Sequence, residues 1–282
     1  MKTSLRLLFP TLFLAVLLGL SSCNKDEVET TPLGSVNIDM YELLSYSGRE
    51  FGFKAFTDLE SYPVSYEIRS NTKLEGNKIT VNLLDIEKVT VSGVAVPLGP
   101  ASTFVNFGSL SDGEYDFEIN VVDRINSGKL KIYPSFYVLS FDVTDGLTVN
   151  NDTLRRLPEG TLWGYVGYMD TAYAAPAQDF IDTLLSIGAT PLNIAPGNYG
   201  YFEYSEDSVF SQTVNSKYTY AKEFYLSYNQ SLEALNGILY YYDFNYRQLY
   251  INIGWFYGDG KKSAILSRGK LHDEVQLPLR LE

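Results

Sequence analysis

The chain has a single cysteine and a single histidine among 282 residues, so it lacks the side chains that many active sites need. A structural zinc site uses several cysteine or histidine ligands, and a catalytic triad here would depend on His272 alone. A disulfide is excluded because the cysteine has no second cysteine to pair with. The sequence also shows no P-loop and no glycine-rich dinucleotide motif. We therefore expect no metal site and no cofactor. The loop carboxylates Asp142, Asp145 and Asp152 leave a Ca²⁺ ion open, with plain turn residues between strands as the alternative.

Basic residues are also scarce, with 22 Lys and Arg against 34 Asp and Glu and a formal net charge of −12. Proteins that bind nucleic acid cluster Lys and Arg to neutralise phosphates, so we expect no nucleic-acid partner. A membrane-spanning helix is not expected from the apolar run at 7–20, because spanning a bilayer takes about 20 apolar residues.

The start of the chain instead has the pattern of a secretory signal peptide over 1–22. Lys2 and Arg6 precede the apolar run, and small polar residues follow it. The residues LSSC at 20–23 resemble a bacterial lipobox. The resemblance implies cleavage before Cys23 and acylation of its sulfur, and two or more acyl chains are enough for stable membrane anchoring. The alternative is an ordinary signal peptide that ends near a buried cysteine.

The charged residues that follow Cys23 indicate where the mature protein is located. Lys25, Asp26 and Glu27 resemble the export signal of surface-exposed lipoproteins of Bacteroidota. This resemblance implies the outer membrane, with the protein anchored by lipid and facing the cell exterior. A solvated linker has a similar composition. We expect 23–35 to be a lipidated, flexible tether.

Residues 36–155 are predicted to form a β-sandwich. Short runs of alternating apolar and polar residues are separated by turn signals, and no stretch has helical periodicity. Turns are expected at Gly76-Asn77 and at 126–128, where the sequence is Asn-Ser-Gly. Tyr115 follows a glycine turn and resembles a tyrosine corner, which favours an immunoglobulin-like sandwich.

Residues 156–282 differ in composition and are predicted to form an α+β domain. Sixteen of the 23 tyrosines lie from Tyr165 onward. Both tryptophans, Trp163 and Trp255, lie in the same part of the chain. Apolar spacing predicts two helices, at 175–189 and at 231–243, the second capped by Ser231. Strands are expected at 160–169, 197–205, 221–228 and 247–258. This order of strands and helices is the split βαβ arrangement of a ferredoxin-like βαββαβ domain.

Alternation along these strands predicts an aromatic face opposite the helices. Rows of Tyr and Trp suit sugar rings or a protein partner, because they combine an apolar ring with a hydrogen-bonding group. The candidate ligand-binding residues are Trp163, Tyr165, Tyr199, Tyr201, Tyr225, Tyr250 and Asn252. Alternatively, the face packs against the sandwich or the 205–220 segment, or the tyrosines are there because strands favour them.

Three functions follow from these features. The first is a non-catalytic cell-surface lipoprotein that binds a glycan or a peptide through the aromatic strand face. The alternative is a structural or adhesive subunit of a fimbria-like surface assembly. A second alternative is a carboxylate-based hydrolase, because glycoside hydrolysis needs only two acidic groups about 5 to 10 Å apart. We expect a protein that is not an enzyme.

Overall fold

The computed structural model describes residues 30–45, 48–58, 62–63, 66–88, 98–205, 209–211, 218–257 and 262–267. The protein is mainly β, with two long helices in its second half. Cys23, Lys25, Asp26, Glu27 and His272 lie outside the described residues, as does the predicted signal peptide.

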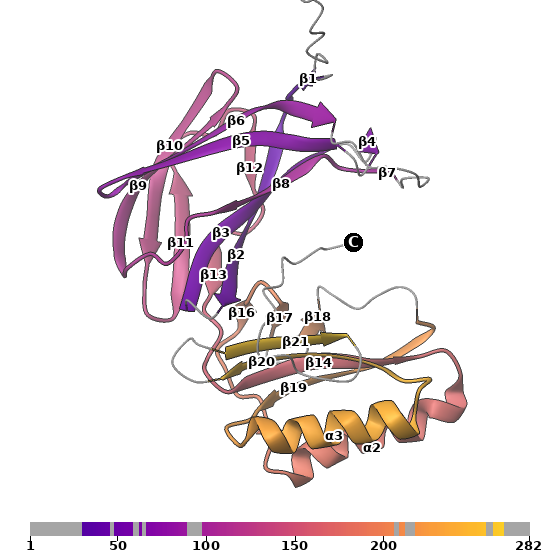
Figure 1. The fold of residues 1–282 in the computed structure, drawn as a ribbon. Coiled ribbons are helices and arrows are strands. Elements are labelled where there is room, and N and C mark those ends of the chain that lie inside the picture. Colours follow the sequence, from indigo (N-terminus) through magenta and orange to yellow (C-terminus); the bar gives the residue numbers. More distant parts are fainter. Residues whose placement is uncertain are drawn as a thin grey trace, which may run out of the picture.

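The first half of the chain forms one large curled sheet (Figure 1). Its strands pair in the order β12-β2-β3-β8-β5-β6-β9-β10-β11-β13, and β1 also pairs with β6. Their bounds are β1 Thr30–Pro32, β2 Val36–Ser45, β3 Gly48–Thr57, β5 Tyr66–Glu75, β6 Lys78–Lys88, β8 Ser102–Asn106, β9 Gly113–Val121, β10 Arg124–Ile132, β11 Phe136–Phe141, β12 Leu147–Val149 and β13 Thr153–Arg155. A separate two-stranded pair joins β4 (Tyr62–Pro63) to β7 (Leu98–Gly99).

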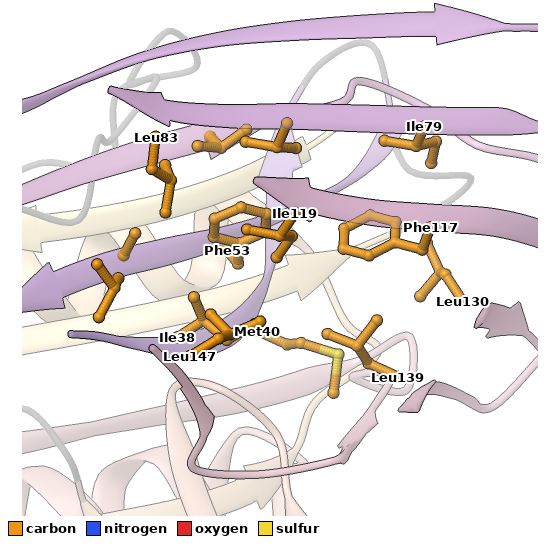
Figure 2. Close-up of a cluster of buried hydrophobic side chains, with 14 of the residues drawn as sticks. Ile38, Met40, Phe53, Ile79, Leu83, Phe117, Ile119, Leu130, Leu139 and Leu147 are labelled. Atoms are coloured by element: carbon orange, nitrogen blue, oxygen red, sulfur yellow. The ribbon is translucent and has the colours of Figure 1, made fainter. Parts of the chain in front are cut away.

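The curled sheet encloses a single hydrophobic core, because alternate residues of its strands point inward. Figure 2 shows Ile79 and Ile119 from β6 and β9 pointing toward Ile38 and Leu139 from β2 and β11. Two parts of one sheet thus face each other across the core.

Two of the predicted local features of this half are confirmed. Gly76-Asn77 forms the turn between β5 and β6, and Gly76 has a φ of 58° that favours glycine. The Tyr115 hydroxyl donates a hydrogen bond to the carbonyl oxygen of Ser111, at 3.1 Å. Tyr115 therefore makes the backward hydrogen bond expected of a tyrosine corner.

The predicted turn at 126–128 is wrong, since these residues lie inside β10 and the chain turns at Val122-Asp123. Gly128 serves close packing instead of a turn: a Cβ there would lie 2.0 Å from the carbonyl oxygen of Ser140 in β11. Asn126 is fully buried and donates hydrogen bonds to the carbonyl oxygens of Ile119 and Asp145.

The predicted tether over 23–35 is too long at its C-terminal end. Thr30–Pro32 pair with β6 as strand β1, opposite Asp85 to Glu87. Leu33 is buried in the core. The apolar contact of Leu33 and the backbone pairing of β1 hold these residues in the fold.

The second half is built on a five-stranded sheet with two helices on one face (Figure 1). Its order is β15-β19-β14-β20-β21, with bounds β14 Thr161–Tyr168, β15 Thr190–Pro191, β19 Tyr220–Ser227, β20 Tyr250–Tyr257 and β21 Lys262–Ser267. Both predicted helices are confirmed as α2 (Ala174–Ser186), which follows the short 3₁₀ helix η1 (Thr171–Tyr173), and α3 (Leu232–Asn245). The Ser231 hydroxyl accepts a hydrogen bond from the Ala234 amide at 3.1 Å, as expected of an N-cap.

The strand predicted at 197–205 does not join this sheet. The segment forms β16 (Gly197–Asn198) and β17 (Phe202–Tyr204), which pair with β18 (Val209–Ser211) in a separate three-stranded sheet. Gly200 has a φ of 79° and turns the chain between β16 and β17, so the segment folds back on itself. The small sheet lies between the large sheet and the five-stranded one (Figure 1).

Candidate functional site

The most chemically unusual position of the molecule is Glu42 in β2. Alternate residues of β2 point into the core: Val36, Ile38, Met40, Glu42 and Leu44 are all buried. Glu42 is the charged member of this apolar series, and its side chain is only 1% exposed. A buried carboxylate is strongly disfavoured unless it is paired and hydrogen-bonded.

Both carboxylate oxygens of Glu42 have partners. Oε1 accepts hydrogen bonds from the Tyr137 hydroxyl at 2.9 Å and from Arg156 Nε at 3.4 Å. Oε2 accepts from Arg49 Nη1 at 2.7 Å and from the Leu157 amide at 3.3 Å. We call Glu42, Arg49, Tyr137, Arg156 and Leu157 the Glu42 cluster.

The Glu42 cluster joins three parts of the fold. Glu42 is in β2 and Tyr137 in β11, two strands that lie far apart in the order of the large sheet. Arg156 and Leu157 belong to the segment that leads from β13 to β14, and so from the large sheet to the five-stranded one. Arg49 also donates to the Leu157 carbonyl oxygen at 2.6 Å. The cluster therefore ties the ends of the large sheet to the connection between the two sheets.

Aromatic packing continues from this cluster into the second half. The Arg49 guanidinium lies 4.3 Å from the ring centroid of Phe256 in β20, a cation–π arrangement. The Tyr201 hydroxyl donates to the backbone carbonyl oxygen of Glu42 at 2.9 Å. A hydrophobic cluster surrounds these contacts, and we call it the junction core: Leu44, Leu157, Trp163, Tyr199, Tyr201, Phe202 and Phe256.

The chemistry of the Glu42 cluster is that of a structural ion pair. Two guanidinium groups, a phenol and an amide saturate the carboxylate, and Arg156 is itself shared with Asp112 at 3.0 Å. Burial, together with the negative charge of Glu42, raises the pKa of the Tyr137 phenol well above its usual range. Tyr201 is affected in the same way and by the same causes. Both phenols therefore stay neutral donors.

These raised pKa values predict a fall in stability at alkaline pH. Burial raises the pKa of Tyr41 to about 12, and the pKa values of Tyr137 and Tyr201 are raised further. Tyrosines of the unfolded chain ionise near pH 10. Above that pH the unfolded state binds fewer protons than the folded state, so the free energy of unfolding decreases as pH rises toward 12.

Urea unfolding between pH 8 and 11 measures this decrease. The double variant Tyr137→Phe/Tyr201→Phe is expected to show a shallower decline, because two of the phenols that hold their protons in the folded state are gone. A decline equally steep in both proteins would contradict the assignment.

The predicted aromatic face exists in part. Trp163 and Tyr165 in β14, Tyr225 in β19, and Tyr250 and Asn252 in β20 lie on the face opposite the helices, as alternation predicts. Two of them are nevertheless buried: Trp163 is 7% and Tyr165 2% exposed. Tyr225, Tyr250 and Asn252 are half-buried.

Tyr199 and Tyr201 do not belong to that face, contrary to the prediction. They lie in the β16–β17 region and cover the face from the opposite side, with the Tyr201 ring centroid 4.9 Å from that of Trp163. Phe202 packs on Tyr225 at 4.9 Å in an edge-to-face arrangement. The three-stranded sheet thus covers the Trp163 part of the face, so this part is core.

The rest of the face carries a second aromatic group. The ring centroids of Tyr165 and Tyr250 lie 6.0 Å apart, and Tyr218 stacks on Tyr250 at 4.9 Å. A Cβ at Gly167 would lie 2.7 Å from the Tyr218 ring, so only glycine lets this ring lie close to β14. Three tyrosines are packed here, and Tyr250 and Tyr218 retain partial exposure.

Sequence reasoning did not identify the Glu42 cluster, although one signal was present. In the run from Val36 to Leu44, alternate residues are apolar except Glu42, which marks a charge on a core-facing position. The positions of Arg49 and Arg156 gave no comparable signal, because their pairing with Glu42 depends on how the sheet curls.

The described ranges show neither a candidate metal site nor a candidate membrane-spanning helix. Nowhere in them do three or more His, Cys, Asp or Glu side chains gather as they would around a metal ion. Neither α2 nor α3, nor any other helix in the part of the chain that the structure covers, has the length and hydrophobicity to cross a membrane. Compared with known proteins, the chain matches no family model, no curated protein and no solved structure.

Proposed function

We propose that this protein is a non-catalytic lipoprotein of the cell surface that holds a partner as part of a surface assembly. The observation that supports this function is the Glu42 cluster. It places the one buried carboxylate of the described residues in a saturated structural network and links the two sheets into one unit. Glu42 itself is committed to these partners, so it is not available as the acidic group that a carboxylate-based hydrolase would need.

Glycan or peptide binding through the strand face is the second candidate. Half-buried Tyr225, Tyr250 and Asn252 support it, since they lie on one face of neighbouring strands and retain accessible surface. The buried residues Trp163 and Tyr201 are less suited to this role, because they already pack on each other.

The location belongs to the same proposal. Acylation of Cys23 and the export signal at Lys25, Asp26 and Glu27 would anchor the protein in the outer membrane, facing outward. Strand β1 begins at Thr30, and seven residues reach at most about 25 Å, so the large sheet would stand close to the lipid surface.

The fold class is proposed in finer terms as well. The tyrosine corner at Tyr115 and the single core between facing strands support a variant of the immunoglobulin-like sandwich. In the second half, β19 and β20 both pair antiparallel with β14 between them, and α3 connects them. This split βαβ unit supports a variant of the ferredoxin-like domain.

The two candidate functions are separated by a titration of a soluble form that begins at Asn24, which lacks Cys23 but keeps strand β1 and the buried Leu33. Polysaccharides are added while tryptophan fluorescence is followed, and for an assembly subunit we expect no saturable change and emission typical of buried tryptophan. Saturable quenching that disappears in Tyr250→Ala would instead establish the strand face as the binding site. On intact cells, chemical crosslinking is expected to give discrete larger species that are lost in Cys23→Ala.

A further inference from the structure

The outer side of α3 exposes an unusual concentration of aromatic side chains. Tyr240, Tyr241 and Phe244 are 60%, 52% and 62% exposed, while Leu235, Leu239 and Tyr242 of the same helix pack inward. The rings of Tyr240 and Phe244 are nearly parallel, with an interplanar angle of 16° and centroids 6.4 Å apart. Neighbouring exposed aromatic residues are typical of interaction sites, because covering them removes a large apolar area from water.

Gly237 lies on the same side of α3, one turn before Tyr240 and Tyr241 and two turns before Phe244. A Cβ at Gly237 would meet no atom within 4 Å. Glycine inside a helix is less stable than alanine, and no contact in the described structure requires it here. The missing side chain leaves a low point on the helix next to the exposed rings of Tyr240 and Tyr241. We call Gly237, Tyr240, Tyr241 and Phe244 the α3 surface.

The charged residues within helices α2 and α3 have one sign; the cations nearby are Arg247, which follows α3, and Lys222 of β19, which donates to Gln178 of α2. Helices α2 and α3 together contain four carboxylates and no Lys, Arg or His. These carboxylates, all exposed, are Asp179, Asp182, Glu233 and Asp243. Carboxylates beside tyrosine rings are complementary to Lys and Arg. The cationic groups of these residues pair with carboxylates and stack on aromatic rings.

The position of α3 in the molecule argues against contact between this helix and the membrane that would hold the anchor. Strand β1, where the described chain begins, lies at the end of the large sheet that is remote from α2 and α3 (Figure 1). A lipid anchor ahead of β1 would therefore hold the helices away from its own membrane. Anionic lipid would also be repelled by the carboxylates, and a two-fold contact between copies of this chain would bring like charges together.

We propose that the α3 surface binds a segment of a partner protein that carries Lys or Arg beside apolar residues. The apolar residues cover the aromatic rings and one of them enters the low point at Gly237, while the cationic groups contact the carboxylates of α2 and α3. This inference rests on the proposed function, since it names the surface through which an assembly subunit would hold its partner.

Fluorescence anisotropy with two labelled peptides tests the proposal. One peptide alternates Arg with Leu, and the other, of equal length, has Glu in place of Arg. The soluble protein is expected to bind the first peptide and not the second. The variant Tyr240→Ser/Phe244→Ser is expected to lose about tenfold in affinity. The matched variant Tyr133→Ser/Tyr220→Ser removes two exposed tyrosines elsewhere and is expected to bind like the original protein.

Gly237→Ala tests the low point without destabilising the fold, because the added Cβ meets no atom within 4 Å and alanine is a better helix former than glycine. It is expected to raise the urea midpoint, because alanine favours the helix, and to weaken the Arg-Leu peptide several-fold by filling the low point. Equal binding by the two peptides, or binding unaffected by Tyr240→Ser/Phe244→Ser, would overturn the proposal. So would self-association or binding to anionic vesicles that this double variant abolishes.

Peptide binding and crosslinking on cells together show whether the α3 surface or the proposed assembly function is wrong. If the Arg-Leu peptide does not bind but crosslinked species persist on cells, the partner uses another surface. If the crosslinked species are also absent, the assembly function itself is contradicted.

Discussion

Replacing Glu42 with Gln is expected to lower the free energy of unfolding by about 3 kcal/mol, near the lower end of the range for breaking a buried ion pair. The substitution removes the negative charge that Arg49 and Arg156 share, and Arg156 keeps its pair with Asp112. The two arginine side chains are only 22% and 15% exposed. Their partial exposure is the reason for choosing the lower end, since water hydrates part of each guanidinium. Urea unfolding at neutral pH measures the loss.

The matched control is Glu118→Gln, which removes a carboxylate from an exposed pair. Lys78 Nζ lies 3.0 Å from Glu118, and the two side chains are 50% and 22% exposed. Surface pairs of this kind contribute less than about 1 kcal/mol. Equal losses in the two variants would show that the Glu42 cluster is no more than a surface ion pair. Hydrogen exchange adds a second readout, because amides around Leu157 should exchange faster in Glu42→Gln alone.

Trp163→Ala is expected to lower the free energy of unfolding by about 3 to 5 kcal/mol, the range for truncating a large core aromatic residue. Trp163 is 7% exposed and packs on Tyr201 and Phe202, with centroid distances of 4.9 and 6.4 Å. The small sheet would lose these two ring contacts with β14. Tyr240→Ala is the control, and its effect should be within about 0.5 kcal/mol because the side chain is exposed.

Gly254 offers an independent test of the same packing. A Cβ at this position would lie 2.4 Å from the Trp163 ring, so Gly254→Ala must displace the ring and is expected to cost about 1 to 3 kcal/mol. In the Trp163→Ala background the same substitution has room and should cost little. A double-mutant cycle therefore predicts strong coupling between the two positions, and simple additivity would contradict the packing described.

The local part of this structure could be predicted from the sequence. Period-two and period-3.6 patterns identified the three long strands β14, β19 and β20 and both helices of the second half, and Ser231 identified the start of α3. Alternation also assigned Trp163 and Tyr225 to the correct side of the sheet. These features depend on neighbours along the chain, which the sequence shows directly.

The long-range part could not be predicted, for identifiable reasons. Glycine permits both turns and close contacts, so the sequence at 126–128 is equally compatible with a turn and with the packing of Gly128 against Ser140. Tyr199 and Tyr201 follow a strand-like pattern, and only the turn at Gly200 directs them onto Trp163. The partners of Glu42 come from positions up to 115 residues away in the chain.

The connection between the sheets also has a mechanical consequence. A pull on α3 against an anchor ahead of β1 would pass through the segment at Arg156 and Leu157. There the Leu157 amide and the Arg156 side chain donate to the Glu42 carboxylate, and Arg49 donates to the Leu157 carbonyl oxygen. Several hydrogen bonds would have to break together before the two sheets could separate, and resistance to force depends on the rate of that step. The same cluster that maintains the fold at rest would thus set the force at which the two sheets separate.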